Sequence, residues 1–388
     1  MLINRPSFID DIRKSIRNNP VTAIMGPRQC GKTTLARSIA KTTDSIIFDL
    51  EDPTDFELLL QNPKMILQQQ KGLVVIDEVQ RNPDMFRLLR VLADEADAPR
   101  KFLILGSASP DLIQKSSESL AGRIGFVNLT GFNLMETGIK SLDKLWKRGG
   151  FPKSFLGTDE EQSFSWRENF IQTFLERDIS NFGFNIPAVT LRRFWLMLAH
   201  YHGQIWNGAE FARSLGVSEP TVKRYLDILT GTYMIRQLQP WHENLKKRQV
   251  KAPKVYIRDS GIVHALLGME ADAILTNVKS GASWEGFIIE QLLSRLSTRD
   301  FYYWRTHTGI ELDLMVLKSG KRLGFEVTFS ETPKITRSML SAREDLKLDQ
   351  LFIIYNGHRL VALEHSIIAV PASNIVDFDF LSSGCKGS

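Results

Sequence analysis

A glycine-rich loop near the N-terminus constrains the fold of this 388-residue chain more than any other feature. Residues 26–33 read GPRQCGKT and match the pattern G-x-x-x-x-G-K-[ST], whose glycines let successive backbone N–H groups point at phosphate oxygens. The loop follows the apolar run VTAIM (21–25) and opens the helically spaced segment TTLARSIAK. Strand, loop and helix in this order predict an α/β fold with an anion site at the helix N-terminus.

The residue types in this loop suit a nucleoside triphosphate with Mg²⁺. Lys32 is expected to reach the β and γ phosphates, and the Thr33 hydroxyl to bind Mg²⁺. We therefore expect ATP and Mg²⁺ as cofactors, with binding by Gly26, Pro27, Arg28, Gln29, Cys30, Gly31, Lys32, Thr33 and Thr34.

An acidic pair follows a second apolar run, GLVVIDEVQ. Asp77 and Glu78 end what reads as a buried strand, so their carboxylates would face the bound nucleotide. Asp77 is expected to hold Mg²⁺ together with Thr33, and Glu78 to polarise the attacking water. The alternative is a pair of acidic residues that serve solubility at a strand end.

Two more short apolar runs, in SIIFDLED and KFLILGSAS, alternate with helix-like segments. This alternation predicts a phosphate-loop NTPase sheet of parallel strands with helices on both faces. Ser107 and Ser109 would then lie near the γ-phosphate, and an ordinary strand-to-loop turn is the alternative. In SLAGRIG, Arg123 could contact phosphate in its own or a neighbouring subunit, or form a surface ion pair.

Composition limits the class of protein. The 43% hydrophobic and 24% charged residues predict a folded chain, and its length predicts two or three domains. Two cysteines, Cys30 and Cys385, cannot build a disulfide framework or a cysteine zinc site, which favours a reducing, cytoplasmic location. No apolar stretch reaches about 18 residues and the N-terminus lacks a signal-type core, so we expect no membrane association.

From about Gly149 the pattern becomes helical and rich in aromatics. The segment NGAEFARSLGVSEPTVKRYLDILTGTYMIRQL predicts helix, turn at Gly216, second helix and strand, which is helix-turn-helix order with a following wing. Basic residues dominate positions 223–258, where a basic field attracts phosphate backbones. The candidates for DNA contact are Thr221, Lys223, Arg224, Lys246, Lys247 and Arg248, and the run continues to Lys254. A packing module or a solvated charged face are the alternatives.

A third pattern starts near Ser283, with the amphipathic helix WEGFIIEQLLSRL and alternating strands in FYYWRTH, IELDLMVLK and RLGFEVTF. The chain thus divides into a nucleotide-binding domain (1–145), a helical and winged-helix domain (146–280) and a C-terminal α/β domain (281–388).

In combination, the phosphate loop GPRQCGKTT, IDEVQ, GSAS, SLAGR, GGFP (149–152) and ERDI (176–179) resemble the bacterial and archaeal AAA+-type ATPases that carry a C-terminal nuclease-like domain. The resemblance covers essentially the whole chain. It implies an ATPase core, a winged-helix middle and a restriction-endonuclease-like C-terminal fold. It also makes Arg177 a second candidate for a phosphate-contacting arginine and suggests a homo-oligomer.

By the same resemblance, Glu285, Asp313 and Glu326 correspond to the acidic positions of a PD-(D/E)xK nuclease. Such a site needs a lysine two residues after Glu326, where this chain has Thr328, and Lys334 would have to fold back to replace it. The sequence therefore favours a vestigial site. Read without the family, GIELDLMV is a strand whose alternating carboxylates face solvent.

These observations favour a Mg²⁺-dependent ATPase that couples hydrolysis to DNA binding or remodelling. Two alternatives stay open at this point: an ATP-gated DNA nuclease, and a nucleotide-switch scaffold for a protein partner, for which differential affinity between two states matters more than turnover.

Overall fold

The computed structural model describes residues 3–95, 99–107, 120–179, 186–242 and 249–382. Its contacts divide the chain into two compact units. The first comprises Met1–Gly131 with Ile228–Met234, and the second comprises Phe132–Asp227 with Ile235–Ser388. The sequence-based division into three domains stays a prediction.

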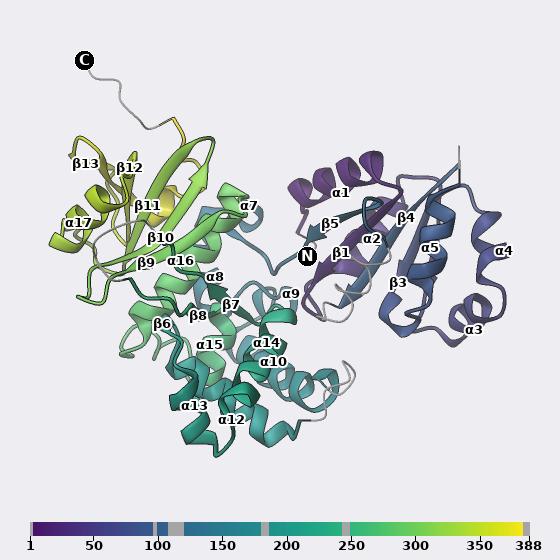
Figure 1. Ribbon diagram of the computed structural model, residues 1–388, viewed down its shortest axis with the longest axis horizontal. Helices are drawn as coiled ribbons and strands as arrows, with labels where there is room; N and C mark the ends of the chain where they lie inside the picture. The colour runs from purple at the N-terminus through teal and green to yellow at the C-terminus, as the bar shows by residue number, and fades with distance from the viewer. Residues whose placement is uncertain (1–2, 96–98, 108–119, 180–185, 243–248, 383–388) are drawn as a thin grey trace. The chain divides into compact units, whose positions relative to one another are not determined.

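The first unit is built on a parallel sheet of five strands in the order β2-β3-β4-β1-β5 (Figure 1). The predicted strands are confirmed, and the sequence reading omitted β5. The strands are β1 (Val21–Gly26), β2 (Ser45–Asp49), β3 (Gly72–Asp77), β4 (Arg100–Ser107) and β5 (Ile124–Asn128). Because β1 is buried along its whole length, the loop that follows it starts from a fixed point in the core.

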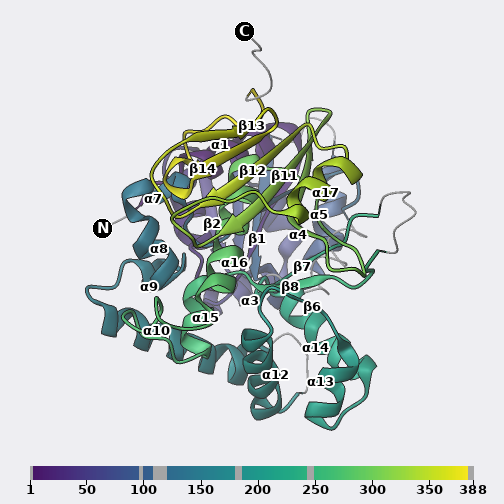
Figure 2. The same ribbon diagram turned by 90° about the vertical axis from the view of Figure 1, so that its left-hand side faces the viewer.

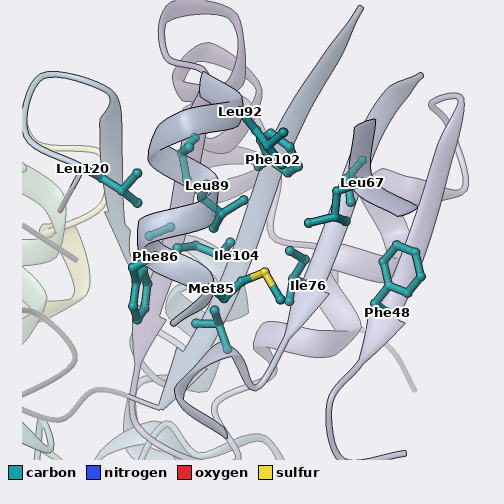
Figure 3. Packing of buried hydrophobic residues seen from close by; sticks show 14 of the residues in the cluster. Phe48, Leu67, Ile76, Met85, Phe86, Leu89, Leu92, Phe102, Ile104 and Leu120 are labelled. Atoms are coloured by element: carbon teal, nitrogen blue, oxygen red, sulfur yellow. The ribbon is translucent and has the colours of Figure 1, made fainter. Parts of the chain in front are cut away.

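Helices cover both faces of this sheet, as predicted. One face packs against α1 (Pro6–Asn18) and α2 (Lys32–Ala40) through a cluster that includes Ile12, Ile24 and Leu35. The other face carries α3 (Pro53–Gln61), α4 (Pro63–Gln68) and α5 (Met85–Ala93). Figure 3 shows Phe86 and Leu89 of α5 in the same buried cluster as the sheet residue Ile104. Two buried apolar layers therefore hold the sheet, which leaves its carboxyl edge for the loops.

The second unit begins with short helices and then a three-stranded antiparallel sheet in the order β6-β8-β7. The predicted helix, turn and helix are present, with Gly216 in the left-handed region at φ 69° between α13 and α14. The elements are α7 (Leu134–Thr137), α8 (Leu142–Arg148), α9 (Pro152–Phe155), α10 (Glu160–Thr173), a π-helical turn (Phe174–Asp178), α12 (Ala188–His200), β6 (Gln204–Ile205), α13 (Gly208–Leu215), α14 (Glu219–Gly231), β7 (Ile235–Leu238), β8 (Lys254–Ile257) and α15 (Ser260–Leu266).

The C-terminal part of the second unit is a mixed sheet of six strands in the order β13-β14-β12-β11-β10-β9, against which α16 and α17 pack (Figure 2). The predicted helix and three strands are confirmed as α16, β9, β10 and β11. The elements are α16 (Ser280–Leu296), β9 (Phe301–Arg305), β10 (Glu311–Lys318), β11 (Lys321–Thr328), α17 (Arg337–Asp345), β12 (Gln350–Tyr355), β13 (Val361–Glu364) and β14 (Ile367–Pro371).

Candidate active site

The loop between β1 and α2 owes its shape to backbone conformations that its sequence permits. Gly31 lies at φ 97° and caps α2, and Gln29 lies at φ 61°. At Gly26 an added Cβ would lie 2.2 Å from the carbonyl oxygen of Leu129, so only glycine fits where β1 ends. The turn places the first N–H groups of α2, which have no partner within a helix, at the mouth of the loop.

Lys32 is buried, with 6% of its surface exposed, and lies folded over this loop. Its Nζ donates to the carbonyl oxygens of Gly26 at 3.1 Å and Pro27 at 2.8 Å. Both acceptors are neutral, so an incoming phosphate offers the ammonium group a stronger, charge-assisted partner. The lysine is therefore held close to its expected working position by bonds that can be exchanged.

Asp77 ends β3 and is brought next to the loop, with 3% of its surface exposed. Burial raises the pKa of this carboxyl group, against hydrogen bonds from the Thr33 side chain and from the Glu78 N–H at 2.9 Å. Asp49, at the end of the neighbouring strand β2, pairs in register with Asp77 and adds a second negative charge. A hydroxyl and a carboxylate in contact are the two protein ligands that Mg²⁺ takes beside a bound phosphate.

Glu78 follows Asp77 in the left-handed region, at φ 53° and ψ 43°, which is uncommon for a non-glycine residue. Burial raises the pKa of its carboxyl group, while the charges of Lys32 and Arg28 lower it. The side chain of Gln80 donates to Glu78 Oε2. Sequence reading did not single out Gln80, although its place in the run IDEVQ was the available signal.

Arg5 is the other residue that the sequence reading missed. Its guanidinium group is buried beneath the loop and donates to the carbonyl oxygen of Cys30 at 3.1 Å. It also donates to the carbonyl oxygens of Thr130 at 3.0 Å and Gly131 at 3.1 Å. Arg5 thus ties the phosphate loop to the segment after β5. An arginine directly before the first helix carries no recognisable motif.

Taken together, these residues fit a nucleoside triphosphate with Mg²⁺. The loop supplies backbone N–H donors and a lysine for phosphate, and Thr33 with Asp77 supplies two metal ligands. Within the part of the chain that the structure describes, no group of three or more His, Cys, Asp or Glu side chains could hold a metal ion. Mg²⁺ would accordingly take its remaining ligands from phosphate and water, its usual behaviour in such sites.

Ser107 and Arg123 lie at opposite edges of the same sheet. The Ser107 backbone pairs with Gly26 at the carboxyl edge, next to the phosphate loop, while Ser109 falls outside the described residues. The carbonyl group of Arg123 accepts from the N–H of Val21, where β1 begins, about 17 Å from the loop at the usual rise of a strand.

Arg123 also has a partner within the chain. Its Nε lies 2.5 Å from Asp94 Oδ1, and its Nη2 donates to Oδ2 at 3.0 Å. The prediction that Arg123 contacts a phosphate of its own subunit is therefore wrong, because no side chain is long enough to reach from this edge of the sheet to the phosphate loop. Contact with a neighbouring subunit stays a prediction. Arg177 is exposed on the π-helical turn of the second unit, and its proposed role stays a prediction too.

Comparison with known proteins agrees with this geometry. A family model described as an AAA domain matches residues 18–138, and two models described as domains of unknown function match residues 139–273 and 280–375. Uncharacterized proteins of Mycobacterium tuberculosis and Mycobacterium bovis are each 49% identical to this chain over 377 residues, covering 97% of this chain and 85% of the relative. The chain belongs to their family.

A solved structure extends the likeness at the level of the fold. The Walker-type ATPase of Pyrococcus abyssi superimposes with a TM-score of 0.51 at 15% identity, covering 69% of this chain and 96% of that one. This likeness shows the fold, and the AAA domain match supports an ATPase of AAA type. In the described residues no helix is long and apolar enough to cross a membrane.

Outside the AAA domain, the helix-turn-helix residues lie as predicted, but much of the basic run does not. Lys223 and Arg224 are exposed on α14, and Thr221 is half-buried with its hydroxyl 2.8 Å from that of Ser218. Lys246, Lys247 and Arg248 fall outside the described residues.

Three other members of the basic run point into the protein. Arg236 and Arg258 both pair with Glu290, and Lys254 is 3% exposed. Burial raises the pKa of Glu290, but the two arginines outweigh it and bring the value to about 2. The basic field expected over positions 223–258 is therefore weakened at these three residues, because acidic partners far along the chain neutralise them.

The GGFP motif has a structural role in the second unit. Gly149 lies at φ 75°, and a Cβ there would fall 2.0 Å from Asp259 Oδ1. The N–H of Gly150 donates to Asp259 Oδ2 at 2.7 Å. The glycines thus let the chain turn tightly against the residue that caps α15.

The acidic residues of the nuclease-like region do come together. Lys254 Nζ lies 3.1 Å from Glu285 Oε1 and 3.4 Å from Asp313 Oδ1, and it also pairs with Glu311. Burial and the charge of Asp313 raise the pKa of Glu326 well above its ordinary value. Asp313 is 9% exposed, so the interpretation of GIELDLMV as a solvent-facing strand is wrong there. Lys334, the suggested replacement cation, is exposed, and no sequence pattern connects Lys254 with this cluster.

Proposed function

We propose that this protein is a cytoplasmic Mg²⁺-dependent ATPase whose hydrolysis site is formed by Lys32, Thr33, Asp77 and Glu78. The observation that carries the proposal is the contact of the Thr33 hydroxyl with Asp77 beside a lysine held on neutral carbonyl groups. The AAA domain match and the fold of the Pyrococcus abyssi ATPase support it.

Each residue has a distinct task. Lys32 exchanges its two carbonyl acceptors for phosphate oxygens and balances the charge that builds up there. Thr33 and Asp77 would hold Mg²⁺, which would supply positive charge to the phosphate groups. Glu78 orients the attacking water and accepts its proton, a task that suits a carboxylate whose pKa is raised by burial.

The first test is steady-state ATP turnover. We expect Lys32→Ala to lower the rate at least ~10²-fold, because it removes a preorganised cation from the developing charge. Lys41→Ala is the matched control, since Lys41 is exposed at the far end of the same helix and should leave the rate unchanged. A Lys32→Ala rate close to that of the wild type would reject the site.

We further propose that hydrolysis is coupled to DNA. The support is the order of α13, Gly216, α14, β7 and β8, which is that of a winged helix, with Lys223 and Arg224 exposed on its second helix. The inward-facing Arg236, Lys254 and Arg258 narrow the candidate contact surface to α14 and the residues before Val250. Binding would rest on phosphate contacts and would weaken with salt.

ATP turnover with single-stranded, duplex and branched DNA tests the coupling. We expect stimulation by at least one form, and a smaller stimulation with an unchanged basal rate in Lys223→Ala. Loss of one phosphate contact should also reduce, by about 1, the slope of the logarithm of DNA affinity against the logarithm of salt concentration. Lys153→Ala, exposed in the same unit, is the matched control. An ATP turnover rate that no DNA form changes would reject the coupling. Slow turnover together with tight ATP binding would favour the nucleotide-switch scaffold.

A homo-oligomer in which Arg123 meets the site of a neighbouring subunit remains part of the proposal. Particle mass measured with and without ATP, in the wild type and in Arg123→Ala, tests it. We expect ATP-dependent assembly and a turnover defect in the variant. A monomer in both states with full Arg123→Ala turnover would refute it.

A further inference from the structure

The buried cluster around Lys254 brings together parts of the chain that are distant in sequence. Lys254 starts β8, Glu285 lies on α16, Glu311 and Asp313 lie on β10, and Glu326 lies on β11. All five belong to the second unit. Only 4% of the Lys254 side chain is exposed, so its charge must be compensated inside the protein.

The donors of Lys254 are matched by acceptors. An ammonium group carries three N–H donors, and Nζ contacts one oxygen each of Glu285, Asp313 and Glu311. Burial lowers the pKa of Lys254, but these carboxylates outweigh it and hold the pKa well above the ordinary lysine value. The raised pKa favours the charged form of Lys254, and its three N–H donors are taken by these three carboxylates.

Further donors of the chain occupy the same carboxylates. Tyr256 Oη donates to Glu285 Oε1 at 2.5 Å, and the N–H of Val327 donates to Asp313 Oδ2 at 3.0 Å. Arg305 Nη1 donates to Glu311 Oε2 at 3.0 Å. Glu326 differs, because its Oε1 is shielded from solvent and has no hydrogen-bond partner in the described part of the chain.

This geometry points to Lys254 as a built-in cation, which compensates these carboxylates in place of a divalent metal ion. The cluster is then an internal network of ion pairs that joins β8 to α16 and β10 without a metal ion. It stands independently of the proposed ATPase, since none of its residues belongs to the phosphate-loop site.

The neighbouring backbone supports a joining role. The Tyr303 N–H of β9 donates to the carbonyl group of Gln239 at 3.0 Å, and the Trp241 N–H donates back to Tyr303 at 2.7 Å. Farther along, the Val250 N–H donates to the carbonyl group of Arg305 at 3.0 Å. The segments that flank the β7–β8 connection therefore extend the edge of the C-terminal sheet, and Lys254 closes the same junction from inside.

The first test is Mn²⁺ binding to the nucleotide-free protein, followed by the loss of the free-ion paramagnetic resonance signal. We expect superimposable titrations for the wild type and for Asp313→Asn, because Lys254 already compensates Asp313. Any Mn²⁺ at the phosphate-loop site contributes equally to both curves. A Mn²⁺ site in the wild type that Asp313→Asn removes, or Mn²⁺-dependent plasmid cleavage lost in that variant, would overturn the inference.

The second test removes the built-in cation. Lys254→Met leaves uncompensated carboxylates, so its melting temperature should rise by roughly 5 °C or more in millimolar Mn²⁺, whereas the wild type and Lys254→Arg should not respond. A folded Lys254→Met that ignores Mn²⁺ would contradict the inference.

If Lys254→Met does not fold, Glu326→Gln decides. At pH 8 it should raise the melting temperature, because it replaces an unpaired buried carboxylate by a neutral amide. Glu331→Gln, exposed nearby, is the matched control. A Glu326→Gln melting temperature at or below that of the wild type would mean that the Glu326 carboxylate is held by a donor, whereas the inference gives all three Lys254 donors to Glu285, Glu311 and Asp313.

Discussion

Two buried lysines of this protein, Lys32 and Lys254, lie close to carboxylates and yet have opposite surroundings. Lys32 is hydrogen-bonded to two neutral carbonyl groups, and its acidic neighbours Asp77 and Glu78 act on it only through space. Lys254 is in direct contact with three carboxylates. An ammonium group bound to neutral carbonyl groups forms stronger, charge-assisted hydrogen bonds when it moves to an incoming anion. An ammonium group in direct ion pairs would have to leave carboxylates buried and uncompensated, so its movement is unfavourable. The two lysines are both buried, so the partners of the ammonium group determine whether it is available to a ligand or holds parts of the chain together.

The largest effect predicted from this contrast concerns stability. Lys254→Met should lower the free energy of unfolding of the second unit by about 3–5 kcal/mol, because it strips the partner from buried carboxylates. Lys32→Met should cost the first unit only about 1 kcal/mol, since it removes hydrogen bonds to carbonyl groups.

Tryptophan fluorescence in urea measures the first of these changes, because all seven tryptophans lie in the second unit. Amide hydrogen exchange of β1 measures the second. Equal losses of unfolding free energy in Lys254→Met and Lys32→Met would contradict the proposed distinction between the two lysines.

The sequence located one of these lysines and not the other for a physical reason. The Lys32 site depends on neighbours within one loop and on two strand ends, which a local pattern encodes. The Lys254 cluster depends on the pairing of β8 with distant strands, and the expected position of its cation, Thr328, suggested that no cation was present. The ion pairs of Arg236 and Arg258 could not be predicted for the same reason, because their partner Glu290 lies more than thirty residues away in the sequence.

A second prediction sharpens the account of the phosphate loop. Arg5→Met should destabilise the first unit by about 3 kcal/mol and weaken ATP binding, because one buried and two partly buried carbonyl groups lose their donor. Differential scanning calorimetry with and without MgATP measures both effects. Arg13→Met removes an exposed hydrogen bond from the guanidinium group to the Thr42 hydroxyl at 3.2 Å, and should change neither. Unchanged ATP affinity in Arg5→Met would show that the loop keeps its shape unaided.

The smallest predicted effect is a pH dependence in the second unit. Burial lowers the pKa of His264 to about 4, below the unfolded value of 6.5, so the unfolded chain binds the proton first. The stability that neutral His264 contributes is present above pH 6.5 and is lost as pH falls toward 4. Burial raises the pKa of Glu285 to about 7, and its effect has the opposite sign, with stability lost as pH rises from 4.5 through 7.

Because the two effects oppose each other, variants must separate them. The difference in unfolding free energy between the wild type and His264→Gln should shrink by about 2 kcal/mol from pH 7 to pH 5. His200→Gln, exposed on the same unit, should leave the difference constant. Parallel profiles for the wild type and His264→Gln would show that His264 becomes charged in the folded protein.

The central claim, that the phosphate-loop site hydrolyses ATP and does not merely bind it, is tested most directly with Glu78→Gln. ATP affinity in Mg²⁺, measured by calorimetry, should stay within roughly threefold of the wild type, because the amide preserves the shape of the site. Turnover of the same sample should fall about 10²-fold or more, because the carboxylate that orients the water and accepts its proton is gone. Turnover at the wild-type rate with ATP still bound would contradict the account.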